Sequence, residues 1–235
     1  MPTEAMQDRK QQRRERQHAA VRDEIKAMAR SHMARDGAAA LSLRAVATAL
    51  GLSSAAIYYY FPNRDALITA LIVDAYRALG AWVRAADVAG APLHGRLEAA
   101  MLAYRDWAIA HPAEYALLFG TPIPGYVGPP EVTAPQARAA LAAFGELFAL
   151  AHEQGALAAP TEAVPPRIVA HASGRAAAQP EPPLPMLLAT MRAWGMAHGL
   201  VGLELDHHLQ PIVGDAAALY AFEMRRLLRE LGVRP

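Results

Sequence analysis

Apolar residues recur at intervals of three and four along almost the whole chain, which places them on one face of an α-helix. From Val21 the interval continues through Ile25, Met28, Ala29 and Met33, and strand-like alternation does not occur. Because such faces are buried by packing helices against helices, the pattern predicts an all-α fold.

The composition narrows the class of protein further. Of the 235 residues, 54% are hydrophobic, which is enough for a sizeable core in one compact unit or in a small module joined to a larger one. No cysteine is present, so disulfides, thiolate metal sites and cysteine nucleophiles are excluded. The start of the chain is polar where a secretory leader is apolar, and no uncharged apolar run is long enough to span a membrane. We expect a cytoplasmic protein with no membrane partner.

Positive charge is concentrated at the start of the chain. Residues 1–77 contain 12 Lys and Arg against 8 Asp and Glu, whereas residues 78–235 contain 11 against 14. Five cations crowd into eight residues around the acid Glu15: Arg9, Lys10, Arg13, Arg14 and Arg16. Such a run stays solvated until it meets an anion. We expect residues 1–20 to form a basic arm, with an unstructured solubilising tail as the alternative.

Two very short helices are expected between residues 42 and 61. Ser42 is a good N-cap for the first, Gly51 can take the left-handed conformation that ends it, and Ser53 can cap the second. Two short helices joined by a glycine-containing turn are typical of a helix-turn-helix, whose second helix enters a DNA major groove. We assign residues 21–66 to such a domain, although any pair of short packed helices fits the turn alone.

Three consecutive tyrosines end the second of these helices. So small a module cannot bury Tyr58, Tyr59 and Tyr60 with all their hydroxyls satisfied, so some must face outward. Together with Arg64 and the first N–H groups of the next helix, they suit a phosphate-binding surface. The alternatives are that Tyr59 packs at the helix end and that Arg64 pairs with Asp65.

Residues 21–77 resemble the DNA-binding domain of the TetR/AcrR family of bacterial regulators. The resemblance is carried by Leu43-Arg44-Ala45-Val46-Ala47, by Gly51-Leu52-Ser53 and by Ile57 through Leu67. It implies that Ile57 and Phe61 are buried, that Tyr58 and Tyr60 contact DNA, and that Arg64 holds a phosphate. Arg44 would contact a base edge, with guanine the best match.

The groove-facing positions of the resemblance hold small side chains, namely Ser53, Ser54, Ala55 and Ala56. Their direct readout of bases is thin. Specificity would then rest on Arg44, Tyr58 and Tyr59, on DNA shape, and on a basic arm that enters an A·T-rich minor groove through Arg13, Arg14 and Arg16.

The rest of the chain, residues 67–235, is expected to be a larger helical domain for effector binding and dimerisation. Loops are expected at 121–130 and 179–185, where prolines gather. Expected helices cover residues 65–88, 92–110, 112–120, 132–155, 164–178, 184–204 and 210–231.

Two segments of this domain resemble the WHG-type C-terminal domain found in members of the same family. They are Ala110 to Gly120 and the stretch from Trp194 through His198 and Gly199. Gly195 and Gly199 lie four apart and favour close helix packing within the bundle, and His198 is expected mainly to hold a buried hydrogen bond. The resemblance implies a homodimer formed by helices 184–204 and 210–231. The expected interface is Trp194, His198, Gly199, Tyr220, Met224, Leu227, Leu228 and Leu231.

An apolar interior suits an apolar or amphipathic effector. Arg105, Asp106 and Glu114 are expected to face solvent. Each candidate lining residue could equally be plain core, and the candidates are Met101, Tyr104, Trp107, Ile109, Tyr115, Phe119, Phe144, Phe148 and His171.

Enzymatic chemistry is not expected. The nine histidines lack metal-ligand spacing, and the sequence has no glycine-rich phosphate loop, nucleophile elbow or cofactor motif. The sequence therefore predicts a homodimeric, ligand-responsive DNA-binding transcriptional regulator, a repressor released from a palindromic operator by a small molecule. The alternative is a helical small-molecule-binding or protein-interaction dimer without sequence-specific DNA binding, which the alanines at 55 and 56 motivate.

Overall fold

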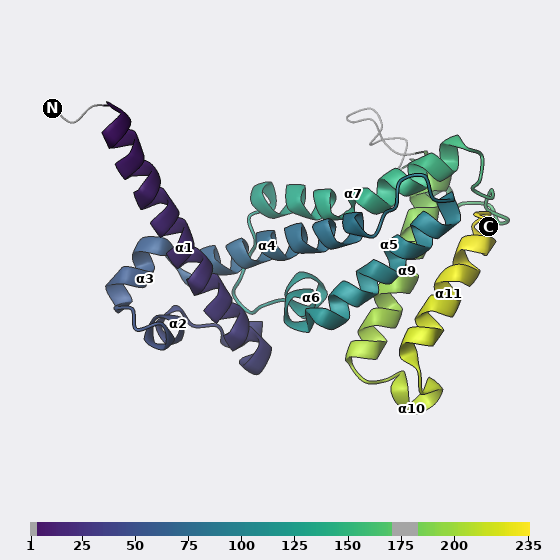
Figure 1. Ribbon diagram of the computed structural model, residues 1–235. Helices are drawn as coiled ribbons and strands as arrows, with labels where there is room; N and C mark the ends of the chain where they lie inside the picture. Colours follow the sequence, from purple (N-terminus) through teal and green to yellow (C-terminus); the bar gives the residue numbers. More distant parts are fainter. Residues whose placement is uncertain (1–3, 171–182) are drawn as a thin grey trace. The chain divides into compact units, whose positions relative to one another are not determined.

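The computed structural model describes residues 4–170 and 183–235, and every regular element in these ranges is a helix (Figure 1). The all-α prediction is therefore confirmed. The elements are α1 (Glu4–Asp36), η1 (Ala38–Ala40), α2 (Leu43–Ala49), α3 (Ser54–Tyr60), α4 (Arg64–Ala85), α5 (Leu93–Ala110), α6 (Pro112–Phe119), α7 (Pro130–Glu153), α9 (Leu184–Leu205), α10 (Gln210–Val213) and α11 (Ala216–Glu230).

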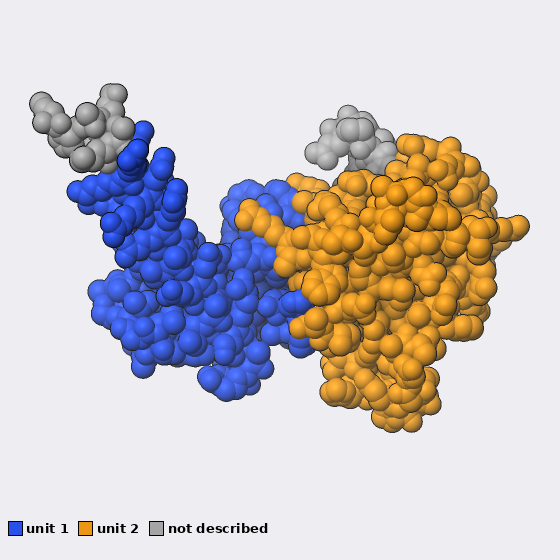
Figure 2. Space-filling view, viewed as in Figure 1, with its two compact units in different colours: residues 1–76, 111–136 blue, residues 77–110, 137–235 orange. Residues whose placement is uncertain are grey.

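The chain divides into two compact units, coloured separately in Figure 2. Unit 1 consists of residues 1–76 and 111–136, so α6 joins the N-terminal helices although it lies far along the chain. Unit 2 consists of residues 77–110 and 137–235. Helix α4 supplies residues to both units.

Side-chain caps set the boundaries of the short helices in unit 1. The Ser42 Oγ accepts a bond from the Ala45 N–H at the start of α2, and the Ser53 Oγ accepts one from the Ala56 N–H at the start of α3. At the start of α4 the Asn63 Oδ1 accepts a bond from the Ala66 N–H at 2.8 Å. These caps satisfy N–H groups that have no partner inside the helix. The caps predicted at Ser42 and Ser53 are thus confirmed.

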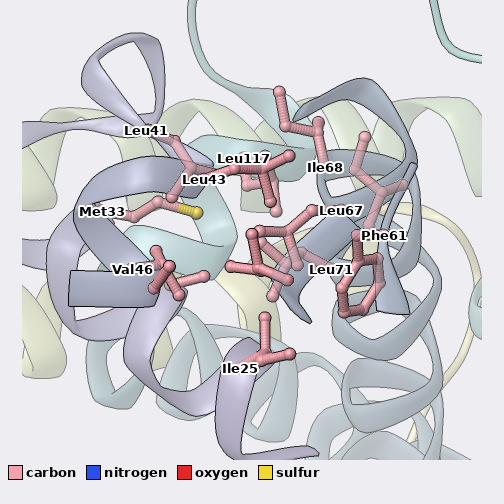
Figure 3. Close-up of a cluster of buried hydrophobic side chains, with 14 residues drawn as sticks. Ile25, Met33, Leu41, Leu43, Val46, Phe61, Leu67, Ile68, Leu71 and Leu117 are labelled. Atoms are coloured by element: carbon pink, nitrogen blue, oxygen red, sulfur yellow. The ribbon is translucent and has the colours of Figure 1, made fainter. Parts of the chain in front are cut away.

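The core of unit 1 lies between α1, α2, α3 and α4 (Figure 3). Ile25, Val46, Ile57 and Phe61 are at most 1% exposed, which confirms the core roles expected for Ile57 and Phe61. Leu117 of α6 joins the same cluster. Truncating a side chain such as Phe61 to alanine in a core of this kind costs about 3 to 5 kcal/mol.

Ion pairs also join α6 and α4 to α1. The Asp74 Oδ2 lies 2.8 Å from the Lys26 Nζ and 3.0 Å from the Arg30 Nη2, and the Arg30 Nε lies 3.7 Å from the Glu114 Oε1. Glu114 is therefore half-buried and paired, which corrects the expectation that it faces solvent. This cluster of ion pairs could not be predicted from the sequence, because its members come from three separate segments.

Unit 2 is built on α5, α9 and α11, with α7 against the second half of α4. Gly80 of α4 lies so close to α7 that a Cβ at this position would be 2.9 Å from the Ala140 Cα. Helix α11 packs on α5 and α9. The Tyr220 hydroxyl donates a buried hydrogen bond of 2.9 Å to the Met101 carbonyl of α5.

Two helices differ clearly from those predicted, and a third lies mostly outside the described residues. Helix α1 begins at Glu4 rather than near Val21, so the basic run is helical. The helix expected over 210–231 is divided, because Gly214 has a φ of 72° and Asp215 caps α11 through the Ala218 N–H. Residues 166–170 are helical, but most of the helix expected over 164–178 lies outside the described residues.

Helix α4 alone among the described helices is long and apolar enough to cross a membrane by length and composition. Its apolar side chains fill protein cores instead: Leu67, Ile68, Leu71, Leu79 and Val83 are at most 1% exposed. That burial is typical of a core helix.

Candidate DNA-binding surface and effector cavity

The α2–turn–α3 segment is a compact pair of seven-residue helices. Gly51 closes α2 with a φ of 66°, a left-handed conformation that favours glycine, and the Leu52 N–H donates to the Ala47 carbonyl at 2.9 Å. Val46 and Ile57 anchor the two helices in the core. The pair therefore presents its outer side chains from fixed backbone positions.

The outer side chains of this pair include most of the predicted DNA contacts. Arg44 is exposed on α2, and Tyr58 and Tyr59 are 43% and 75% exposed on α3. The small residues at the start of α3 are Ser53, Ser54 and Ala55, which are exposed, and Ala56, which is half-buried. Cationic, phenolic and hydroxyl groups on a helix-turn-helix are suited to phosphate and base-edge contacts.

Tyr60 has two partners on α1, Arg22 and His18. Its carbonyl accepts a 2.5 Å hydrogen bond from the Arg22 Nη1, and the Arg22 guanidinium lies 4.2 Å from the centre of the Phe61 ring. The His18 ring of α1 lies 4.9 Å from the Tyr60 ring and 5.4 Å from the Tyr59 ring. A cation at the C-terminal end of α3 stabilises its last carbonyls. Neither of these α1 residues could be identified from the sequence, because only the folded chain brings them to α3.

Arg64 holds the connection between α1 and α2 through hydrogen bonds. Its guanidinium donates to three carbonyls in the connection between α1 and α2: Leu41 at 2.9 Å, Ala39 at 2.8 Å and Ala38 at 3.3 Å. The Nε and Nη2 groups of Arg64 are therefore engaged within the protein, and the phosphate contact expected of this residue stays a prediction that would use Nη1.

A small apolar cavity lies inside unit 2, with a volume of about 40 Å³. It lies among α5, α7 and α9 and is lined by Met101, Tyr104, Leu141, Phe144, Phe148, Thr190, Met191, Ala193, Trp194 and Ala197. Because drug-sized ligands need several hundred cubic ångströms, an effector would have to widen this space. Met191 is 48% exposed and so connects the lining with the surface of α9.

The predicted effector residues divide into three groups. Met101, Tyr104, Phe144 and Phe148 line the cavity. Trp107 is buried in the same unit without lining the cavity, and Ile109 is exposed. Tyr115 and Phe119 belong to unit 1, where the Phe119 ring lies 5.2 Å from Tyr115 and 6.2 Å from Tyr76, which corrects their place in the pocket. His171 lies outside the described residues.

Polar groups stand at one side of the cavity. The Tyr104 hydroxyl lies 3.2 Å from the His198 Nδ1, and the His198 ring stacks on Trp194 at 5.3 Å. This agrees with the hydrogen-bonding role expected for His198. Trp194, expected at a dimer interface, is half-buried and lines the cavity.

Burial lowers the pKa of His198. The folded state therefore favours the neutral ring, whereas the histidine of an unfolded chain binds its proton at about pH 6.5. Because the unfolded state binds more protons below that pH, stability should fall with falling pH through this range. Thermal denaturation at pH 7.5 and pH 5.5 tests this: the loss of Tm on acidification should be smaller in His198→Asn. An equal loss in both proteins would assign the pH dependence to other groups.

A partly buried ion pair between Arg105 and Glu204 also joins α5 to α9. Arg105 donates to both oxygens of Glu204, at 2.7 Å from Nε and 2.5 Å from Nη2. Glu204 is 8% exposed. The expectation that Arg105 faces solvent is therefore wrong, whereas the neighbouring Asp106 is exposed as expected. The hydrogen bonds to Glu204 raise the pKa of Arg105 despite its burial.

The last predicted surface, the apolar seam of α11, is buried within the protein itself. The exposed fraction is at most 9% for each member: Tyr220, Met224, Leu227, Leu228 and Leu231. They pack inside unit 2, which corrects their assignment to a dimer interface. Open space instead surrounds Gly195 and Gly199 on α9, because a Cβ at either position would meet nothing within 4 Å. Among the described residues, no helix of the same chain packs against these glycines, so the close approach of another helix stays a prediction.

The fold and the exposed helix-turn-helix define an all-helical protein of the DNA-binding regulator class. Two family models match the chain: "Bacterial regulatory proteins, tetR family" over residues 25–71 and "Tetracyclin repressor-like, C-terminal domain" over residues 97–227. The second match contains both segments that resemble the WHG-type domain. The chain belongs to the TetR family.

Relatives of known sequence or structure agree with this assignment. The chain is 41% identical to the HTH-type transcriptional regulator Rv1816 of Mycobacterium tuberculosis over 135 residues, which is 55% of this chain, and it spans 58% of that relative's length. The crystal structure of the regulatory protein SCO4313 has a TM-score of 0.76 at 35% identity, with 92% of this chain and 98% of that chain covered. The TetR family regulator PfmR from Thermus thermophilus shares the fold, with a TM-score of 0.58 at 18% identity over 90% of this chain and 99% of that one.

Proposed function

We propose that the protein is a homodimeric transcriptional regulator that binds a palindromic DNA operator through α2 and α3, acts as a repressor in the cytoplasm, and is released by a small molecule. The observation that carries the proposal is the exposure of Arg44, Tyr58 and Tyr59 on a helix-turn-helix whose backbone is capped and anchored. Because its groove-facing residues are small, a single helix-turn-helix discriminates little between DNA sequences. In a dimer, the two helix-turn-helix units would contact both halves of a palindrome if they lie about 34 to 36 Å apart, or a multiple of that distance.

Selection of bound duplexes from a random-sequence library tests the DNA-binding part of this proposal. A regulator should enrich one motif with two inverted half-sites whose centres are about 10 base pairs, or a multiple, apart. Enrichment of no motif would favour the alternative, a helical dimer without sequence-specific DNA binding.

The proposed dimer interface is the open face of α9. Gly195 and Gly199 are exposed there, and Met191 and Leu203 on the same face are 48% and 45% exposed. Residues spaced by four lie on one side of a helix, and glycines allow a second helix to approach closely. A two-fold axis would place the same face of the partner's α9 against it.

Replacing Gly199 by leucine should weaken the dimer at least tenfold. The new side chain has open space within the protomer, so the fold should persist while the partner helix is held away. Analytical ultracentrifugation over a range of concentrations measures the dimer dissociation constant. Gly95→Leu on α5, also surrounded by open space, is the matched control. An unchanged constant in Gly199→Leu would place the interface elsewhere.

The proposed effector is an apolar or amphipathic molecule that widens the cavity of unit 2. The support is the apolar lining, with the Tyr104–His198 pair as a polar group within reach. To release DNA, the effector must bind the conformation that cannot bind DNA more tightly than the conformation that can. The coupling free energy between two such sites is typically about 1 to 3 kcal/mol.

A further inference from the structure

The first half of α1 projects a helical basic surface beyond the helix-turn-helix. His18 is the residue of α1 that contacts Tyr59 and Tyr60 at the end of α3, and the described side chains before it, residues 8–17, are all exposed. The helix runs without interruption from Glu4 through this segment (Figure 1). Among the described side chains, no apolar contact inside the protomer accounts for this length.

The helical geometry places the cations of this segment on neighbouring sides of α1. At 3.6 residues per turn, Arg9, Arg13 and Arg16 fall within about 60° of one another, and Lys10 and Arg14 lie on the adjoining side. Asp8 and Glu15 fall on the opposite side by the same geometry. Arg9, Arg13 and Arg16 together surround a shallow hollow with Gln12. Within the described part of the chain, no ion pair engages any of the five cations.

Repulsion between these cations destabilises the helical segment in the free protein, and binding to a polyanion would relieve it. Cations at intervals of three and four repel one another along a helix by a few tenths of a kcal/mol per pair, roughly 0.2 to 0.5. Phosphates placed along the same face would remove that repulsion. The axial distance from Arg9 to Arg16 is about 10 Å at 1.5 Å per residue, which equals the rise of about three nucleotides of one DNA strand along the duplex axis at 3.4 Å each.

The helical form also decides how the segment can meet DNA. An α-helix with its side chains is about 10 to 12 Å wide, whereas the minor groove of B-DNA is about 6 Å wide. The segment therefore does not fit the minor-groove entry expected of an extended arm. The three arginines lie between about 3 and 14 Å along the helix axis from His18, and so from the end of α3.

We propose that residues 9–16 form a helical clamp for the DNA backbone, in which Arg9, Arg13 and Arg16 bind phosphates flanking the half-site that α3 reads. The clamp rests on the proposed function of α3. It adds affinity and length to the contact with DNA without adding sequence specificity, because phosphates carry no sequence information.

The test compares wild-type protein with a variant carrying Arg9→Gln, Arg13→Gln and Arg16→Gln, which keeps residues that favour helices. The control carries Arg138→Gln, Arg167→Gln and Arg234→Gln, three arginines of the later chain, so both variants lose the same charge. The probe is a 40-base-pair mixed-sequence duplex, and binding is measured by fluorescence anisotropy from 50 to 300 mM salt. Circular dichroism checks that both variants remain folded.

We expect the clamp variant to lose at least tenfold in affinity near 150 mM salt, while the control stays within threefold of wild type. Three lost phosphate contacts should reduce the slope of log K against log salt by about 2.7 per protomer. Equal slopes and affinities in the two variants, or no binding by wild type, would overturn the clamp. If the clamp variant loses affinity but wild type prefers no sequence, the clamp stands and the proposed operator recognition fails.

Discussion

Glu204→Ala should lower the free energy of unfolding by about 3 to 5 kcal/mol, the cost of removing one partner of a buried ion pair, because Arg105 would keep only its 3.1 Å contact with the exposed Asp106. Arg105 is 14% exposed at its side chain and donates to both carboxylate oxygens of Glu204. The Arg105 guanidinium also lies 6.0 Å from the centre of the Tyr220 ring, so α5, α9 and α11 meet at this point. Chemical denaturation followed by circular dichroism measures the change.

Two further variants separate the ion pair from general damage to unit 2. Arg105→Met with Glu204→Leu removes both charges and should be more stable than Glu204→Ala, because apolar pairs often replace buried ion pairs without loss. Arg225→Ala removes an exposed, 3.7 Å contact with Glu98 and should change stability by less than about 1 kcal/mol. A loss below that value in Glu204→Ala would contradict the role assigned to the pair.

Arg64→Ala should lower the free energy of unfolding by about 2 to 3 kcal/mol, because hydrogen bonds from charged groups are worth about 1.5 to 3 kcal/mol and three carbonyls lose their donor. The affected carbonyls belong to Ala38, Ala39 and Leu41, next to the start of α2. Thermal and chemical denaturation measure this loss.

Arg44→Ala is the matched comparison for Arg64→Ala. Arg44 is exposed on α2, so its truncation should change stability by less than about 0.5 kcal/mol and act on DNA affinity instead. Comparing the two variants therefore separates effects on the stability of the helix-turn-helix from effects on its contacts with DNA. Equal stability of the Arg64→Ala and wild-type proteins would contradict the structural role assigned to Arg64.

Local signals in the sequence were sufficient for the short helices. Ser42 and Ser53 cap the helices predicted for them, because an N-cap depends on residues three positions apart. The start of α1 was missed for a related reason. A charged run without apolar residues is typical of a solvated tail, yet Gln, Lys, Arg and Glu are good helix formers and here they extend a packed helix.

Tertiary partners could not be predicted from the same signals. The seam of α11 was correctly identified as an apolar face, but periodicity does not tell whether the face meets the same chain or a second copy. Arg64 reaches carbonyls 23 to 26 residues earlier, and Arg105 meets Glu204 99 residues later. Tyr115 and Phe119 were placed in the pocket because aromatic character does not reveal the unit to which α6 belongs.

Sequence-specific DNA binding by α2 and α3 is the central claim, and the ratio of specific to non-specific affinity tests it most directly. Fluorescence anisotropy near physiological salt would compare genomic fragments flanking the protein's own coding region, or a motif selected from a random library, with scrambled duplexes. We predict roughly 1,000-fold tighter binding to one duplex, or more, as is typical of specific DNA-binding proteins. Arg44→Ala with Tyr58→Ala should abolish most of that preference. Equal binding of all duplexes, unchanged by the double variant, would contradict the claim.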